Sequence, residues 1–237
     1  DMASGNIVSY KYKGVELLCD SFGIRPNFWR APTTRDYRNG SQKKFLVWKN
    51  ILEEDTATEV KVAGKSVTIC YSLGTGCARE LAYTMDDRGA LHIDASFDGK
   101  GADENLEMYR VGVRFRLPSS QNSYSYYGRG PQENYCDRKM GTFIGKYSTK
   151  AEKEHFIFMS PMDTGHHTDT RLVEFPSLAL VADDFFEFNA IDNSVEDLDW
   201  GWFGHINEVP ERNFVEVCID KRMSGIGGQS GWGVAVE

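Results

Sequence analysis

The segment RVGVRFRL, Arg110–Leu117, alternates apolar and polar side chains with a period of two. The apolar set is Val111, Val113, Phe115 and Leu117, and the polar set is Arg110, Arg114 and Arg116. Successive side chains of a β-strand point to opposite faces of its sheet, so this alternation is typical of a strand with one buried and one solvated face. The segment therefore predicts a half-buried strand whose apolar residues point inward and whose arginines point outward.

Two further segments repeat the pattern, ALHIDASF at Ala90–Phe97 and FVEVCID at Phe214–Asp220. The expected inward residues of the first are Leu91, Ile93, Ala95 and Phe97. The best helical pattern is QKKFLVWKNILEE, Gln42–Glu54, and no repeat or linker divides the chain. We therefore predict an all-β fold in which antiparallel sheets pack on one another, with residues 1–237 forming a single domain.

Composition narrows the class of protein. The net charge of -8 argues against nucleic acid or an anionic membrane as the main partner. No apolar run approaches the roughly 18 residues of a membrane span. The five cysteines are odd in number and have no CxxC spacing, which indicates incidental thiols. The chain opens DMASGNIVSY, without a signal peptide. We expect a piece of a longer polypeptide, truncated at both ends, and the compartment stays open between cytoplasm and periplasm.

The unusual residues gather in long loops rich in glycine, proline, arginine and aspartate. These loops are Pro26–Gly40, Tyr126–Gly141, Met159–Arg171 and Gly225–Gly233. They exceed the length that a hairpin needs, and a rigid β scaffold usually places its binding residues on such loops.

The third loop contains an HHxD cluster, formed by His166, His167 and Asp169. A metal site needs further ligands in a fixed geometry. Adjacent histidines on an extended segment point to opposite faces and therefore chelate poorly. We interpret the cluster as hydrogen-bonding loop residues and predict no metal site. His92 is expected on a polar strand face, and His155 and His205 have no adjacent motif.

Three carboxylates could supply the acid pair that hydrolysis of a glycosidic bond requires, namely Glu133, Asp137 and Asp163. The first two lie close in sequence to Arg129 and Arg138, which favours a salt-bridged loop instead. The chain has neither GxSxG nor HExxH. The residues alone therefore show no strong nucleophile constellation, and a salt-bridged loop is the expected role of these carboxylates.

The stretch GIGGQSGWG, Gly225–Gly233, does not match a phosphate-binding loop. It lacks GxxxxGK[ST], and the WGVAVE that closes the chain is not helical in pattern. Trp232 is flanked by glycines, and core packing explains such a residue poorly. Sugar rings present apolar C–H faces that stack on aromatic rings. Trp232 is therefore our candidate for a ligand-facing residue.

Several of these segments resemble, in the same order, the C-terminal domain of the large β-galactosidases of glycoside hydrolase family 2, also called the small chain. The segments are NFWRAPT (Asn27–Thr33), RVGVRFRLP (Arg110–Pro118), YYGRGPQENYCDRKMGTFIGKY (Tyr126–Tyr147), TDTRLVEF (Thr168–Phe175), HINEVPERNF (His205–Phe214) and GIGGQSGWG. The resemblance implies an antiparallel supersandwich related to galactose mutarotase-like domains. Three loops depart from the family pattern: APTTRD replaces APTDND, PMDTG replaces PQENG, and GGQSGWG replaces a GGDDSWG-like loop.

The resemblance also implies that the catalytic residues and this chain belong to different domains. In that family the catalytic glutamates lie in a separate (β/α)8 barrel, and the C-terminal domain lends the sugar site a tryptophan that corresponds to Trp232. We therefore expect a non-catalytic domain that packs on the barrel of a retaining β-galactosidase acting on terminal β-D-galactosides. Its expected partners are the other domains of that enzyme, its galactoside and further copies within a homo-oligomer.

The same resemblance places no cofactor in this chain and leaves any divalent or monovalent cations to the full enzyme. The alternative is a stand-alone carbohydrate-binding or aldose-epimerase-like domain. An epimerase needs a histidine and a carboxylate that face one pocket, and the sequence shows no clear pair.

Overall fold

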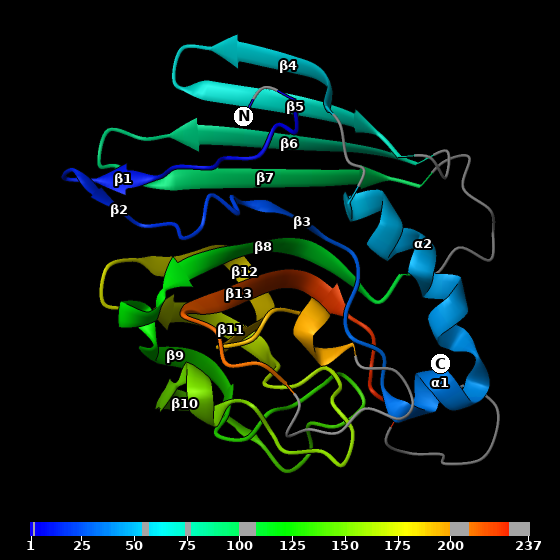
Figure 1. Ribbon diagram of the computed structural model, residues 1–237. Coiled ribbons are helices and arrows are strands. Elements are labelled where there is room, and N and C mark those ends of the chain that lie inside the picture. Colours follow the sequence, from blue (N-terminus) through cyan, green and yellow to red (C-terminus); the bar gives the residue numbers. More distant parts are fainter. Residues whose placement is uncertain (2, 54–56, 74–76, 100–107, 200–208, 228–237) are drawn as a thin grey trace.

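The computed structural model describes residues 1, 3–53, 57–73, 77–99, 108–199 and 209–227, and nearly all of its regular structure is β (Figure 1). A four-stranded sheet contains β4 (Ala57–Ala63), β5 (Ser66–Ser72), β6 (Ala78–Met85) and β7 (Leu91–Asp98), in that order. A seven-stranded sheet has the order β10-β9-β11-β12-β13-β8-β3. Its strands are β3 (Arg25–Asn27), β8 (Arg110–Pro118), β9 (Ser123–Gly130), β10 (Phe143–Lys150), β11 (His167–Glu174), β12 (Ala179–Ile191) and β13 (Phe214–Met223).

The remaining elements are short. A hairpin joins β1 (Lys11–Tyr12) to β2 (Val15–Glu16), and the helices are α1 (Thr34–Asn39) and α2 (Ser41–Glu53). Single 3-10 turns occupy Ser119–Gln121, Ala151–Lys153 and Glu196–Leu198. Every described strand pair is antiparallel, which confirms the predicted all-β class with packed antiparallel sheets. No described helix has the length and apolar character needed to span a membrane.

The core joins the two large sheets. One cluster of buried apolar residues includes Ile69 and Leu81 of the four-stranded sheet and Phe115 and Val217 of the seven-stranded sheet. Helix α2 adds Trp48, which is fully buried. In Figure 1 both helices run down the right-hand side, beside the ends of the strands. The sheets therefore share one apolar interior that α2 helps to close.

Helix α2 confirms the helical pattern predicted at Gln42–Glu54, although it begins one residue earlier, at Ser41. Phe45 and Trp48 are three positions apart and are both buried, while Lys43 and Lys44 are exposed. The Trp48 ring lies 5.5 Å from the Phe28 ring and 5.9 Å from the Phe97 ring of β7, in edge-on geometry. Such aromatic pairs contribute about 0.5–1.5 kcal/mol beyond area burial.

Helix α1 lies inside a segment that the sequence analysis treated as a loop. Its N-cap is Thr33, whose hydroxyl accepts a hydrogen bond from the Asp36 amide at 3.3 Å. The Asp36 carboxylate accepts one from the Thr33 amide at 2.7 Å, which completes a capping box. Gly40 ends the helix in the left-handed conformation, with φ of 71°. The signal was present as Thr-x-x-Asp, one form of the capping-box pattern.

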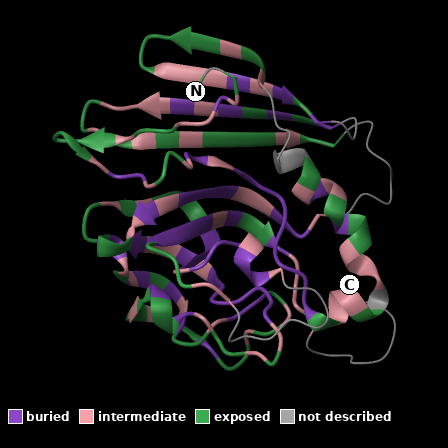
Figure 2. Cartoon of the chain, in the orientation of Figure 1, coloured by how far each residue is buried: buried purple, intermediate pink, exposed green. Residues whose placement is uncertain are grey.

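The solvated face predicted for the arginines of β8 is wrong for Arg110 and Arg114. Arg110 and Arg114 are only 1% and 6% exposed. Figure 2 shows that β8 and its neighbour β13 are mostly buried, on both faces. Burial of these arginines is tolerated because carboxylates from β13 neutralise their charges. Arg110 pairs with Asp220, and Arg114 pairs with Glu216. Strand β7 follows the half-buried pattern, except that Ala95 is exposed.

Candidate functional site

The glycine-rich stretch is described from Gly225 to Gly227, directly beyond β13, and two other loops hold it there. The Asp137 carboxylate accepts hydrogen bonds from the amides of Ile226 at 3.2 Å and Gly227 at 2.7 Å. In addition, the Arg30 Nη2 atom donates to the Gly225 carbonyl oxygen at 3.2 Å. We call this arrangement the loop clamp. It consists of the Asp137 carboxylate and the Arg30 guanidinium, whose hydrogen bonds to residues 225–227 are all to backbone atoms.

Glycine allows close approach of side chains at both ends of the clamped segment. A Cβ atom at position 225 would overlap the Asp137 carboxylate, and one at position 227 would overlap the Arg35 side chain. Gly227 also has φ of 78°, in the left-handed region that side chains disfavour. The bare backbone therefore allows a close approach of the carboxylate and the neighbouring arginine.

Arg30 is held rigidly for its part in the clamp. It is 1% exposed, and its Nη1 atom forms an ion pair with the α1 residue Asp36 at 2.9 Å. The guanidinium carbon lies 4.1 Å from the centre of the Tyr109 ring. Asp36 is also the residue that completes the capping box of α1, so the same carboxylate fixes the helix start and neutralises Arg30.

Arg110 of β8 connects β13, β12 and the loop that contains Asp163. Its Nε atom donates to Asp220 at 3.0 Å, and its Nη2 atom donates to Asn189 at 2.9 Å. Its Nη1 atom lies 3.6 Å from the Asp163 carboxylate, which also accepts a hydrogen bond from the Tyr135 hydroxyl at 3.2 Å. Arg110 and both carboxylates are 1% exposed or less, so the network is buried. Removing Arg110 would leave Asp163 and Asp220 buried without their shared cation.

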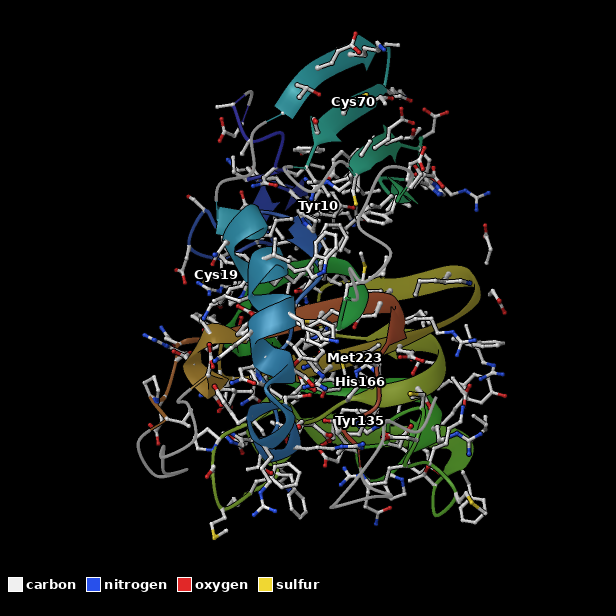
Figure 3. All side chains as sticks on the ribbon, turned by 90° about the vertical axis from the view of Figure 1, so that its right-hand side faces the viewer. Tyr10, Cys19, Cys70, Tyr135, His166 and Met223 are labelled. Atoms are coloured by element: carbon white, nitrogen blue, oxygen red, sulfur yellow. The ribbon has the colours of Figure 1, made fainter. Side chains whose placement is uncertain are left out.

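The two adjacent histidines point into different environments, as the sequence predicted. His166 Nε2 lies 3.0 Å from the Glu187 carboxylate, and His167 Nε2 lies 2.8 Å from the Glu154 carboxylate. Both rings are fully buried. Figure 3 shows Met223, His166 and Tyr135 one below another, and the Tyr135 and His166 rings stack at 5.2 Å.

The third member of the HHxD cluster turns away from both histidines. Asp169 pairs with Arg129 at 2.7 Å and with Lys139 at 3.4 Å. Partial burial raises the pKa of Asp169, but these two cations outweigh it and hold the pKa below its usual value. Among the residues that the structure describes, no group of three or more His, Cys, Asp or Glu is placed to hold a metal ion.

The remaining candidate carboxylate, Glu133, ties two loops together. Its Oε2 atom accepts hydrogen bonds from the Gly165 amide at 2.8 Å and the Thr164 hydroxyl at 3.1 Å, and its Oε1 atom pairs with Arg138. The salt-bridged role predicted for Glu133 is confirmed. The geometry thus gives structural partners to all three candidate carboxylates, Glu133, Asp137 and Asp163.

Comparison with known proteins is consistent with this arrangement. A family model described as the β-galactosidase small chain matches residues 1–237. The chain belongs to the β-galactosidase small chain family. The predicted resemblance is confirmed. A β-galactosidase from Streptococcus thermophilus is 29% identical over 253 residues that cover 99% of this small chain, and one from Priestia megaterium is 27% identical over 98% of it. The small chain spans about a quarter of the length of these relatives, 24% and 23% respectively.

The predicted sugar-binding residue of the small chain, Trp232, lies outside the described residues, as does His205. The clamp ends five residues before Trp232. Sequence reasoning found Asp137 but assigned it to the wrong kind of interaction, since its partners are backbone amides and not an arginine. It missed Arg30 altogether. The signal was an arginine between aromatic and proline residues in NFWRAPT, but no pattern indicates that its partner lies near residue 225.

An open groove of about 820 Å³ adjoins the clamp of the small chain. Asp137 lines it together with Glu133, Glu154 and Phe156. Glu154 is bound to His167, but that histidine is fully buried and does not face the groove. The histidine–carboxylate pair that an epimerase would present to a pocket is therefore not formed by His167 and Glu154.

Proposed function

We propose that this small chain is the non-catalytic domain of a β-galactosidase that hydrolyses terminal β-D-galactosides, and that it completes the galactoside site with Trp232. The catalytic carboxylates come from another part of the enzyme. The observation that carries the proposal is the loop clamp, which fixes residues 225–227 from two sides just before Trp232. A fixed starting point reduces the entropy lost when an aromatic ring is positioned against a ligand.

The three candidate carboxylates support a non-catalytic role. A retaining glycosidase needs two carboxyl groups about 5 Å apart that are open to the scissile bond. Here Asp137 is bound to two amides, Asp163 is buried beside Arg110, and Glu133 is bound to an amide, a hydroxyl and Arg138. Each carboxylate contributes to loop structure, and protonating or freeing it for catalysis would disrupt these contacts.

The stacking role is tested with Trp232→Ala and Trp232→Phe in the intact enzyme, using a chromogenic β-galactoside. Loss of one stacked ring removes about 1–3 kcal/mol of binding, as judged from aromatic stacking elsewhere. We expect Trp232→Ala to raise KM about fivefold or more at an unchanged thermal midpoint, and Trp232→Phe to retain most of the affinity. Unchanged KM in both variants would contradict the role of Trp232.

The non-catalytic assignment has a separate test. The isolated small chain is assayed on the same substrate, and we expect no turnover above the buffer rate. Turnover by the purified chain that survives in a Trp232→Ala preparation would show that this chain contains its own catalytic groups. Tight binding of free lactose by the isolated chain would instead favour the stand-alone carbohydrate-binding domain.

A further inference from the structure

Six large apolar side chains between residues 140 and 159 are exposed, and two of them, Met140 and Phe156, line the groove. The six are Met140, Phe143, Ile144, Phe156, Ile157 and Met159. Met140 is 97% exposed and Met159 is 88% exposed. Single exposed apolar residues are ordinary, but a concentration of them beside a groove marks an interaction site. We call residues 140–159 together with the groove the 140–159 surface.

The groove itself combines apolar and charged lining. Met140 and Phe156 line it directly, and the Phe156 and Phe158 rings lie 4.8 Å apart. Its charged lining residues are balanced in number: Glu133, Asp137 and Glu154 against Arg138, Lys139 and Lys153. Balanced charges beside exposed Met and Phe side chains resemble the polar rim of a protein interface next to its apolar part.

A free strand edge lies beside these side chains. Strand β10 is the last strand of the seven-stranded sheet, and Phe143 and Ile144 begin it (Figure 1). Among the described strands, only β9 pairs with β10. The outer edge of β10 therefore presents unpaired backbone groups next to exposed apolar side chains, which an isolated soluble chain usually avoids.

We propose that the 140–159 surface is where the remaining part of the same β-galactosidase docks on the small chain. This rests on the proposed function, because it takes the partner to be the rest of that enzyme. The curated relatives are about four times as long as this chain, so about three-quarters of such an enzyme lies outside it.

The position of the surface also favours this partner. Asp137 lines the groove and at the same time holds the amides of Ile226 and Gly227. A partner that fills the groove therefore lies next to the clamped start of the loop that leads to Trp232. The same contact that covers the apolar residues brings the rest of the enzyme to that loop.

The two exposed methionines provide a direct test in the intact enzyme. Dilute hydrogen peroxide converts accessible methionine to the sulfoxide, and mass spectrometry gives a rate for each residue. Free methionine in the same solution is the reference for full exposure, and Met162, which is 7% exposed in this chain, is the reference for burial. We expect Met140 and Met159 to oxidise at least about tenfold more slowly than free methionine.

Two outcomes would overturn the proposal. If Met140 and Met159 oxidise as fast as free methionine, nothing covers the surface in the enzyme. If their protection disappears when the enzyme is diluted to separate its copies, the occupant is another copy. Neither result depends on Trp232, and a failure of the KM test for Trp232 would leave the oxidation rates unchanged, so the two ideas fail separately.

A matched pair of variants gives an independent check. Ile157→Glu places a charge on the surface, and Val62→Glu places one on β4 at a residue of similar exposure, 67% against 75%. We expect Ile157→Glu to increase the oxidation rates of Met140 and Met159 in the intact enzyme at least about fivefold and Val62→Glu to leave them unchanged. Equal rates in both variants would contradict docking at this surface.

Discussion

Substitution of Asp137 by alanine tests the loop clamp most directly. The change removes the acceptor of two backbone amides, those of Ile226 and Gly227. A hydrogen bond to a charged group contributes about 1.5–3 kcal/mol. Because Asp137 is only half-buried, water replaces part of each bond, and the lower end applies. Two bonds at the lower end amount to about 3 kcal/mol.

We expect this loss to appear locally, as easier opening of residues 225–227, because the strands of the core do not depend on the clamp. A change of about 3 kcal/mol corresponds to exchange about 100-fold faster at the amides of Ile226 and Gly227, measured by hydrogen exchange with NMR detection. Amides of β13 such as Val217 should change little. Asp137→Asn should give a smaller effect, since its amide oxygen still accepts one bond.

The control is Asp87→Ala, which removes a carboxylate that is 91% exposed and paired with Lys65 on the surface. This control variant should leave the exchange rates of the Ile226 and Gly227 amides unchanged. If Asp137→Ala leaves the exchange of Ile226 and Gly227 unchanged, the clamp does not hold the loop. If it instead accelerates exchange throughout β13, Asp137 stabilises the whole sheet, and the local role is refuted.

Two further predictions concern buried and half-buried ion pairs. Arg110→Met should lower the free energy of unfolding by about 3–5 kcal/mol in urea titration, because it leaves Asp220 buried without its partner, and a double variant with Asp220→Leu should recover much of that loss. If Arg110→Met proves neutral, the network is not stabilising. The pairing of Asp169 with Arg129 and Lys139 holds the pKa of Asp169 below its unfolded value. Its contribution should therefore be complete above about pH 4 and be lost as the pH falls through the folded pKa. Asp169→Asn should make the acid side of the stability profile shallower, and an unchanged profile would contradict this assignment.

The sequence predicted the class of fold because the alternation in segments such as Leu91–Phe97 reports the strand period directly. It failed for Arg110 and Arg114, since period-two alternation cannot distinguish solvent from a second buried face lined with carboxylates. That distinction depends on strand order: β13 supplies Asp220 and Glu216 only because it pairs with β8, about a hundred residues earlier in the chain.

The candidate site was predictable to a similar extent. The separate partners of His166 and His167 were predictable from their adjacency on an extended segment, whereas their full burial was not. The clamp did not, because Arg30 and Asp137 are far apart in sequence from residue 225 and bind backbone atoms, which carry no sequence signature. The role of Trp232 depends on residues beyond the clamp and stays a prediction.

The loop clamp has a consequence for sequence variation within this family. Asp137 and Arg30 grip main-chain amides and a carbonyl, and neither contacts a side chain of residues 225–227 through these bonds. The loop clamp therefore does not depend on most side chains beyond Gly227. It should tolerate the exchange of a GGDDSWG-like sequence for GGQSGWG. Grafting the segment beyond Gly227 from related sequences should consequently preserve the attachment point while changing the side chains that follow it, so this position is a suitable exchange junction.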